Sequence, residues 1–122
     1  MQGPHRSKVR SLSTLDRIEV AGANFGQFIG KGEAANVSVY MVTTSAAHPF
    51  PRTLHKKAEE VIHVLAGRGR VVIDEESFPV TAGSLVFVPP GAVHHIEAED
   101  GELTALAVLS PPVYQGEDLY FV

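Results

Sequence analysis

Residues 83–98 read GSLVFVPPGAVHHIEA, and this stretch decides the fold. An apolar run at 85–88 leads into the Pro-Pro-Gly turn at 89–91, and a second run follows at 93–98. Proline fixes its own backbone angle and glycine adopts angles that other residues avoid, so this turn predicts a stiff corner between two strands. Because side chains alternate between the two faces of a strand, we expect the corner to deliver His94 onto an inward-facing position.

The same alternation of short apolar runs and turns recurs along most of the chain. Short runs rich in Val, Ile, Phe, Leu or Thr are separated by turn signals, including those at 67–69 and 100–101. This spacing is typical of an all-β sandwich or barrel. The runs that we predict as strands are 17–20, 25–29, 37–44, 61–65, 70–73, 78–80, 85–88, 93–98 and 103–109.

One segment admits a second interpretation. Residues 56–60 read KKAEE, which are good helix formers, and Glu60 and His63 stand at the i, i+3 spacing of a helical Glu-x-x-His pair. The β-branched residues that follow, and the glycines at 67 and 69, favour a strand entered from a turn instead. We therefore expect a strand here.

The length and composition of the chain limit the number of domains and the kinds of partner that we expect. A chain of 122 residues has room for one core, so we expect residues 1–14 to form a flexible N-terminal arm and 15–122 a single barrel domain. The formal net charge is −4 and the basic residues are scattered, which argues against a nucleic-acid partner. No run approaches the ~18 apolar residues of a membrane span. We expect a soluble, cytoplasmic protein with no membrane partner.

The sequence contains no cysteine. This excludes a disulfide framework, a thiolate zinc site and a cysteine nucleophile, so any metal must be held by nitrogen and oxygen ligands. A Gly-rich phosphate loop, a Ser-His-Asp order and a nucleophile elbow are also absent from the sequence. Chemistry, if any, would belong to a metal or to acid–base groups beside it.

Three residues have the chemistry and placement of a metal site. His55 lies just before the run at 61–65, Glu60 opens that run, and His94 lies in the later run at 93–98. Two histidines and one carboxylate form a ligand set that leaves coordination positions open for water, oxygen or a chelating substrate. A structural interpretation competes with this one, because a buried histidine can be part of a core and Glu60 can pair with a nearby arginine.

The first of two motifs around these residues is G-x5-H-x-H-x(3,4)-E-x6-G, which residues 53–67 match from the second histidine onward through His55, Glu60 and Gly67. The second motif is G-x5-P-x-G-x2-H-x3-N. Residues 83–98 match it in register, with alanine in place of the final asparagine, through Gly83, Pro89, Gly91, His94 and Ala98. Both motifs, in this order and separation, resemble those of the cupin superfamily. The resemblance implies a double-stranded β-helix with the metal ligands His55, Glu60 and His94.

The chain departs from this pattern at the first motif. Thr53 stands where the superfamily's first metal-binding histidine would be, and Ala47 stands where its first glycine would be. Three outcomes are open: the site works with three protein ligands, another histidine fills the gap, or the pocket binds a ligand without metal. Thr53 and His48 are the accessory candidates, although His48 also fits a solvated loop.

The alternation of side chains along a strand predicts which way two of the other histidines point. His63 and His95 have odd parity relative to Glu60 and His94, so we expect both to point away from the metal, toward an interface or the surface. His5 falls in the N-terminal arm. Several strands are apolar on both faces, notably 61–65 and 103–109, which favours a homodimer that covers the outer face.

From parity, we expect a largely apolar substrate pocket lined by Tyr40, Val42, Ile62, Val64 and Phe87. The resemblance implies a metal-dependent enzyme that acts on a small oxygen-chelating molecule, with chemistry of the dioxygenase, isomerase or cyclase type. Iron, zinc, manganese and nickel all accept nitrogen and oxygen ligands. The alternative is a non-catalytic sensor or small-molecule-binding barrel, which Thr53 favours.

The tail at 117–121 reads EDLYF. We expect it to form either a final strand or an arm that packs Tyr120 and Phe121 against the barrel.

Overall fold

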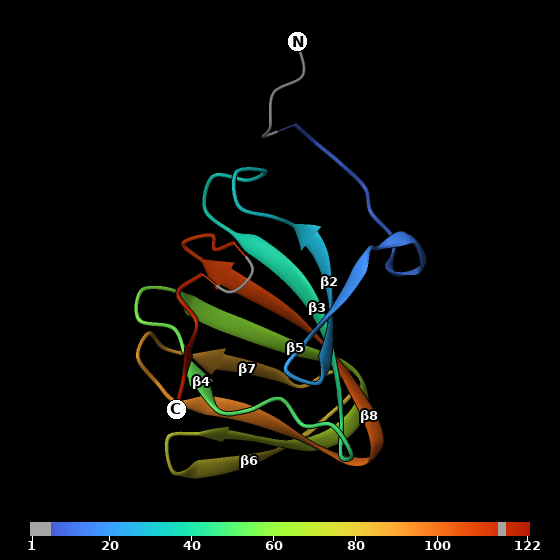
Figure 1. Ribbon diagram of the computed structural model, residues 1–122, viewed down its shortest axis with the longest axis vertical. Coiled ribbons are helices and arrows are strands. Elements are labelled where there is room, and N and C mark those ends of the chain that lie inside the picture. Colours follow the sequence, from blue (N-terminus) through green and yellow to red (C-terminus); the bar gives the residue numbers. More distant parts are fainter. Residues whose placement is uncertain (1–5, 115–116) are drawn as a thin grey trace.

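The chain folds as a curled sheet of antiparallel strands, seen in the computed structural model in Figure 1. The structure describes residues 6–114 and 117–122. These residues include one 3-10 turn, η1 (Leu12–Thr14), and no helix that is long and apolar enough to cross a membrane. The all-β fold predicted from the sequence is confirmed. The strands are β1 (Arg17–Val20), β2 (Ala23–Ile29), β3 (Ser38–Ser45), β4 (Thr53–Leu54), β5 (Glu59–Ile73), β6 (Glu76–Thr81), β7 (Leu85–Val88), β8 (His94–Ser110) and β9 (Tyr120–Phe121).

Two long strands organise the sheet. β8 pairs with β3 and β4, and it also pairs along most of its length with β5. β5 in turn pairs with β6 and β7, while β1 and β2 extend the sheet beyond β3. Because β5 and β8 run through the whole molecule, both ends of the fold are built on the same two segments (Figure 1).

The turn signal at 67–69 does not reverse the chain, so the prediction of two strands at 61–65 and 70–73 is wrong there. Both belong to β5, whose register against β8 shifts on either side of Ala66. Gly67 has φ +84°, and a Cβ on it would lie 2.2 Å from the carbonyl oxygen of Glu102. A Cβ on Gly69 would lie 1.9 Å from the carbonyl oxygen of Glu97. These glycines therefore allow β5 to bulge and touch β8 closely.

The signal at 100–101 is likewise internal to a strand. The runs predicted at 93–98 and 103–109 are joined in the single strand β8. Asp100 and Gly101 have positive φ angles of 55° and 112°, which distort the strand opposite the bulge of β5. Aspartate and glycine mark such left-handed positions in bulges as well as in turns, and the sequence alone does not separate the two cases.

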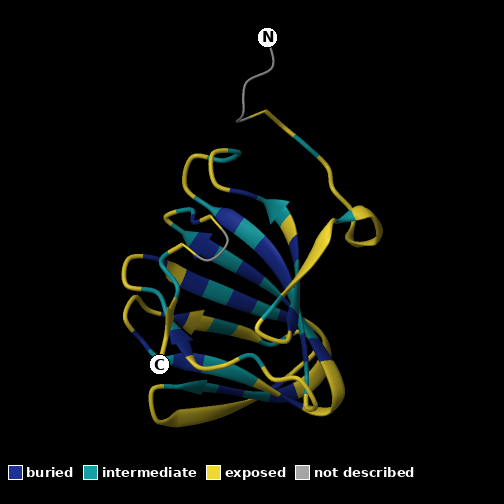
Figure 2. Ribbon diagram, viewed as in Figure 1, coloured by how far each residue is buried: buried dark blue, intermediate teal, exposed yellow. Residues whose placement is uncertain are grey.

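The buried side chains of the described residues form two hydrophobic clusters. Figure 2 shows buried positions alternating with more exposed ones along the central strands. The first is called here the aliphatic core and consists of Ile62, Val64, Val71, Val80, Val88, Ala92, Ala98, Leu103 and Ala105. The second, the site-side cluster, consists of Tyr40, Ala58, Ala107, Leu109 and Val113. β5 and β8 supply most of the first cluster, and β8 continues into the second.

The predicted N-terminal arm is described from residue 6 onward; residues 1–5, including His5, lie outside the described residues. The Arg10 guanidinium forms two hydrogen bonds to the carboxylate of Glu33, at 3.0 and 2.6 Å. The Lys8 ammonium donates to the backbone carbonyl of Glu33 at 3.2 Å. This part of the arm is thus tied to the loop between β2 and β3.

The prediction of a final strand is confirmed. β9 pairs with β4, with Thr53 opposite Phe121 and Leu54 opposite Tyr120. The Lys56 ammonium lies 4.1 Å from the centre of the Tyr120 ring. Residues 117–122 are called here the C-terminal strap, because they cross the loop that follows β4.

Candidate metal centre

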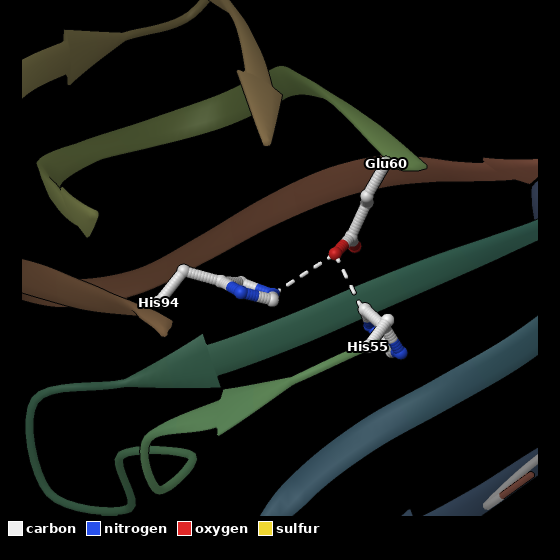
Figure 3. A group of neighbouring side chains, drawn as sticks. All are labelled: His55, Glu60 and His94. Atoms are coloured by element: carbon white, nitrogen blue, oxygen red, sulfur yellow. Dashed lines mark ion pairs between the residues drawn. The ribbon is translucent and has the colours of Figure 1, made fainter. Parts of the chain in front are cut away.

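His55, Glu60 and His94 converge at one point inside the fold (Figure 3). Glu60 Oε1 lies 2.9 Å from His94 Nε2 and 3.3 Å from His55 Nε2. One possible ligand atom from each residue lies within 4.8 Å of the others. Ligand atoms that share one ion at ~2.1 Å stand about 3 Å apart, so this spacing suits a common metal. All three side chains are largely shielded from solvent.

Local structure places each of the three residues. Glu60 shares the inward face of β5 with Ile62, because alternate residues of a strand face the same side. His94 begins β8, directly after the Pro-Pro-Gly corner, and is paired with Thr53 of β4. The amide of Gly91 in that corner donates to the carbonyl of His55 at 2.7 Å. This bond ties the loop that carries His55 to the loop that delivers His94.

Hydrogen bonds on the far side of each ring fix both imidazoles. His55 Nδ1 lies 2.8 Å from the carbonyl oxygen of Asp118, and His94 Nδ1 lies 3.0 Å from that of Ala92. A carbonyl oxygen only accepts, so Nδ1 of each ring donates a proton and Nε2 is the nitrogen that faces Glu60. Metal-binding histidines are commonly oriented in this way by a carbonyl partner.

Asp118 holds the loop of His55 through its side chain as well. Its carboxylate accepts the amides of Lys56, Lys57 and Ala58 at 2.9, 3.0 and 3.0 Å. Burial opposes its charged form, but these three donors and the nearby His55 prevail and lower the pKa of Asp118. Asp118 has φ +53°, a left-handed angle that aspartate tolerates better than most residues. The residue therefore fixes both the loop and the ring of His55.

The electrostatics keep Glu60 ionised despite its burial. Burial raises its pKa, but the adjacent imidazoles of His55 and His94 outweigh that effect and lower the pKa to about 2. For His55, burial lowers the pKa, whereas Glu60 and Asp118 together raise it more strongly, so the net pKa lies above the ordinary value. With both Nδ1 protons donated to carbonyl oxygens, neutral imidazoles leave this buried Glu60 oxygen without a hydrogen-bond donor, so only a protonated ring or a bound cation can pair with it. A buried anion facing two imidazole nitrogens fits a cation in their midst.

A cavity of about 120 Å³ opens beside the three side chains. Of the residues expected to line the pocket, Tyr40, Val42 and Ile62 lie around this cavity. Val64 does not, because it lies deeper along β5 in the aliphatic core. Phe87 does not either: it pairs with Val61 on the outward face and is 52% exposed. Strand parity therefore placed Phe87 on the wrong face of its strand. It placed Val64 on the correct inward face, but Val64 lies too far along the strand to reach the cavity.

The accessory candidates are placed differently from each other. Thr53 is buried and borders the cavity beside His94, whereas His48 is exposed in the loop after β3. His63 and His95 are outside the converging group. His95 bonds Glu97 through Nε2 at 2.8 Å, although it also borders the cavity.

The sequence analysis missed the contribution of the C-terminal segment. Val113, Tyr114 and Leu119 border the cavity, and Asp118 positions His55. The only signal was a turn-forming residue, Asp118, followed by an apolar run, and this signal does not say which loop the tail will cross.

Comparisons with known proteins agree with the fold. A family model described as a cupin domain matches residues 40–110. An uncharacterized protein of Streptomyces coelicolor is 31% identical over 99 residues, covering 80% of this chain and 93% of that protein. Among solved structures, the nucleoside dehydratase Pac13 of Streptomyces superposes with a TM-score of 0.76 at 17% identity, covering 96% of this chain and 92% of that one. Ectoine synthase from P. lautus superposes with a TM-score of 0.78 at 19% identity, covering 95% and 90%. At these identities the two structures show a shared fold alone.

Proposed function

The chain belongs to the cupin domain family, and from this premise we propose that it holds one divalent metal ion through His55, Glu60 and His94 and acts as an enzyme on a small, oxygen-chelating organic substrate. The observation that carries the proposal is the buried Glu60 oxygen, which faces two imidazole nitrogens at 2.9 and 3.3 Å and has no hydrogen-bond donor. The ion would be iron, zinc, manganese or nickel. The reaction would be of the dioxygenase, isomerase or cyclase type.

The residues have separable roles in this mechanism. An ion held by His55, Glu60 and His94 would supply Lewis-acid chemistry to a substrate oxygen. Glu60 contributes the negative charge, and the carbonyls of Asp118 and Ala92 keep both imidazoles turned with Nε2 toward the site. The apolar walls exclude water from the substrate. All three side chains line the cavity, so a substrate bound there would lie next to the ion that they would hold.

A second candidate function is ligand binding without turnover. Thr53 favours it, because a buried hydroxyl stands beside His94 where the cupin pattern has a fourth ligand. The first candidate has one point in its support: two proteins of the same fold, a nucleoside dehydratase and ectoine synthase, are enzymes.

Metal content tests the proposal. We expect about one ion per chain in the purified protein by elemental analysis, loss of that ion in His94→Ala, and its retention in the matched control His63→Ala. Turnover of, or oxygen uptake with, chelating substrates then separates the enzyme from the binding protein. A protein that takes up no metal in either wild-type or control form contradicts the proposal.

We also propose that a second copy of the chain covers the outer face of β5 and β7. In support, Leu85 and Phe87 are 64% and 52% exposed and lie opposite His63 and Val61. Large apolar side chains gathered on one face are typical of an interface. Light scattering is expected to give a dimer that Phe87→Lys converts to a monomer and the arm variant Val9→Lys does not. A monomeric wild-type protein contradicts this part.

A further inference from the structure

Apart from the three ligands, most of the residues that line the cavity beside the metal centre are apolar or aromatic. Its apolar lining includes Phe25, Val42, Phe50, Ile62, Leu109 and Leu119. These side chains come from distant parts of the sheet and from the C-terminal strap. A ligand that reaches the metal centre therefore has hydrocarbon and aromatic surface on most of its other sides.

Most polar groups of the wall are already engaged. The Tyr40 hydroxyl donates to the carbonyl of Val113 at 2.6 Å, and the Thr44 hydroxyl donates to that of His48 at 3.2 Å. Thr53, Tyr114 and His95 also border the cavity and can hydrogen-bond a ligand, and Nδ1 of His95 is buried without a hydrogen-bond partner. Hydrogen bonding beyond the metal centre is thus confined to a few side chains, and the one charged residue among the described lining outside the centre is the acidic Glu117.

No lysine or arginine is among the described residues that line the cavity. Lys31 contacts two lining residues from outside: its ammonium pairs with the Glu117 carboxylate at 2.7 Å and lies 5.1 Å from the centre of the Tyr114 ring. A carboxylate or phosphate at the far end of a ligand would therefore lose its water without gaining a counter-charge. Such desolvation is strongly unfavourable.

The size and shape of the cavity limit which ligands it can hold. The cavity measures about 120 Å³, and an apolar cavity of ~150 Å³ is known to accept one benzene molecule. Phe25 and Phe50 meet edge to face, with ring centres 5.5 Å apart, and Phe121 lies 6.2 Å beyond Phe50. Aromatic walls of this kind suit a planar ring.

We infer that the cavity takes a ring-sized, largely apolar molecule whose polar oxygens all lie at the end that faces His55, Glu60 and His94, and that it rejects molecules with an anionic group at the opposite end. This inference rests on the proposed function for the orientation of the ligand. The composition of the far wall is a separate observation and is testable without metal.

Two probes with the same chelating head test the inference. 4-Methylcatechol carries a methyl group at its far end, and 3,4-dihydroxybenzoate carries a carboxylate there. Binding is followed by amide chemical shifts in the metal-free and the zinc-loaded protein. We expect 4-methylcatechol to bind at least ~10-fold tighter than 3,4-dihydroxybenzoate in both forms, and to shift amides around Ala107 and Leu109.

Variants that fill the cavity localise the binding. Ala107→Leu is expected to abolish 4-methylcatechol binding, whereas the exposed-loop control Ala46→Leu retains it. Val42→Phe fills the same cavity from β3 and serves where Ala107→Leu does not fold. Equal or tighter binding of 3,4-dihydroxybenzoate, or binding that survives in a folded filled variant, overturns the inference.

The two proposals fail in different ways. If zinc does not bind but the metal-free protein still prefers 4-methylcatechol, the metal proposal fails and the inference on the cavity stands. If zinc binds and the carboxylate probe is preferred, only the inference on the cavity fails.

Discussion

The two halves of the interior are built on the same strands but do different work. In the aliphatic core, β5 and β8 present Val64, Val71 and Leu103, which pack together in the interior of the fold. At the other end, β5 presents Glu60, while β8 presents the small Ala107 opposite Ile62. At that end the interior holds a cavity and the charged Glu60 in place of close hydrocarbon packing. One end of the sheet therefore stabilises the fold, and the other end forms the candidate site.

A second difference concerns which segments close each half. All residues of the aliphatic core come from the continuous segment 62–105, which runs from β5 to β8. The metal centre also depends on the C-terminal strap. If this division is real, substitutions at one end should change the stability of the fold and substitutions at the other should change the site.

The largest effect is expected for Leu103→Ala in the aliphatic core. Leu103 is fully buried, and truncation of such a residue costs about 2–5 kcal/mol in the free energy of unfolding. Urea denaturation measures the loss, and zinc affinity of the folded variant is expected to stay within about twofold of wild type. A large loss of zinc affinity in the folded variant would show that the two halves are coupled.

Glu60→Gln should act in the opposite way. It keeps the size of the side chain but removes the negative charge between His55 and His94. Loss of an outer partner of a metal ligand already costs up to ~100-fold in affinity, so loss of this direct ligand should cost at least ~100-fold. Competition with a chelator measures it, with the exposed neighbour Glu59→Gln as the control. Unchanged affinity in Glu60→Gln would rule out the carboxylate as a ligand.

The pH dependence sharpens the comparison further. The pKa of His55 is raised by Glu60 and Asp118, so the proton on His55 competes with a metal ion below that raised pKa. Zinc affinity should fall by about tenfold per pH unit below that pKa. Glu60, with a pKa of about 2, does not contribute to this fall above pH 4. A flat affinity between pH 5 and 7 would contradict the coupling.

The same group affects the metal-free fold with a definite sign. Because the pKa of His55 is higher in the folded state, its ion pair stabilises the fold below the ordinary histidine pKa. That contribution is lost as the pH rises through the raised value. Denaturation of metal-free protein at pH 6 and pH 9 measures it, with His55→Gln as the control that removes the difference.

The smallest effect is expected for Asp118→Ala, in the C-terminal strap. It removes the acceptor of three amides of the His55 loop, and zinc affinity should fall about 10-fold. Asp118→Asn keeps one acceptor and should recover part of the loss. Glu117→Ala breaks only an exposed pair with Lys31, worth about 0–1 kcal/mol, and is the control.

The nitrogen shift of His55 Nδ1 separates positioning from general loosening. In Asp118→Ala this shift should move, while that of His94, held by Ala92, stays. Movement of both would indicate a structural defect rather than loss of one support.

Much of the fold could be predicted from local sequence. Apolar runs mark the strands, the Pro-Pro-Gly corner marks the entry to β8, and the two motifs in residues 53–98 predicted the cupin family, which is confirmed. The meeting of His55, Glu60 and His94 follows from strand parity and the same motifs. These features depend on neighbours along the chain.

What escaped prediction depends on partners far along the chain. Gly67 and Gly101 look like turn glycines, but each lies at a bulge because β5 and β8 press against one another. Val64 was misplaced because strand parity does not say how far along the interior a residue lies. Phe87 was misplaced because parity does not say which face of a short strand points inward. The role of Asp118 requires knowing that β9 pairs with β4.

The contact between His55 and Asp118 spans 63 positions of the chain. During synthesis the N-terminal part emerges first, so His55, Glu60 and His94 leave the ribosome before their last support does. Long-range closure of this kind is a late and slow event in folding. We therefore expect the loop and ring of His55 to take up their final positions only after the strap has docked.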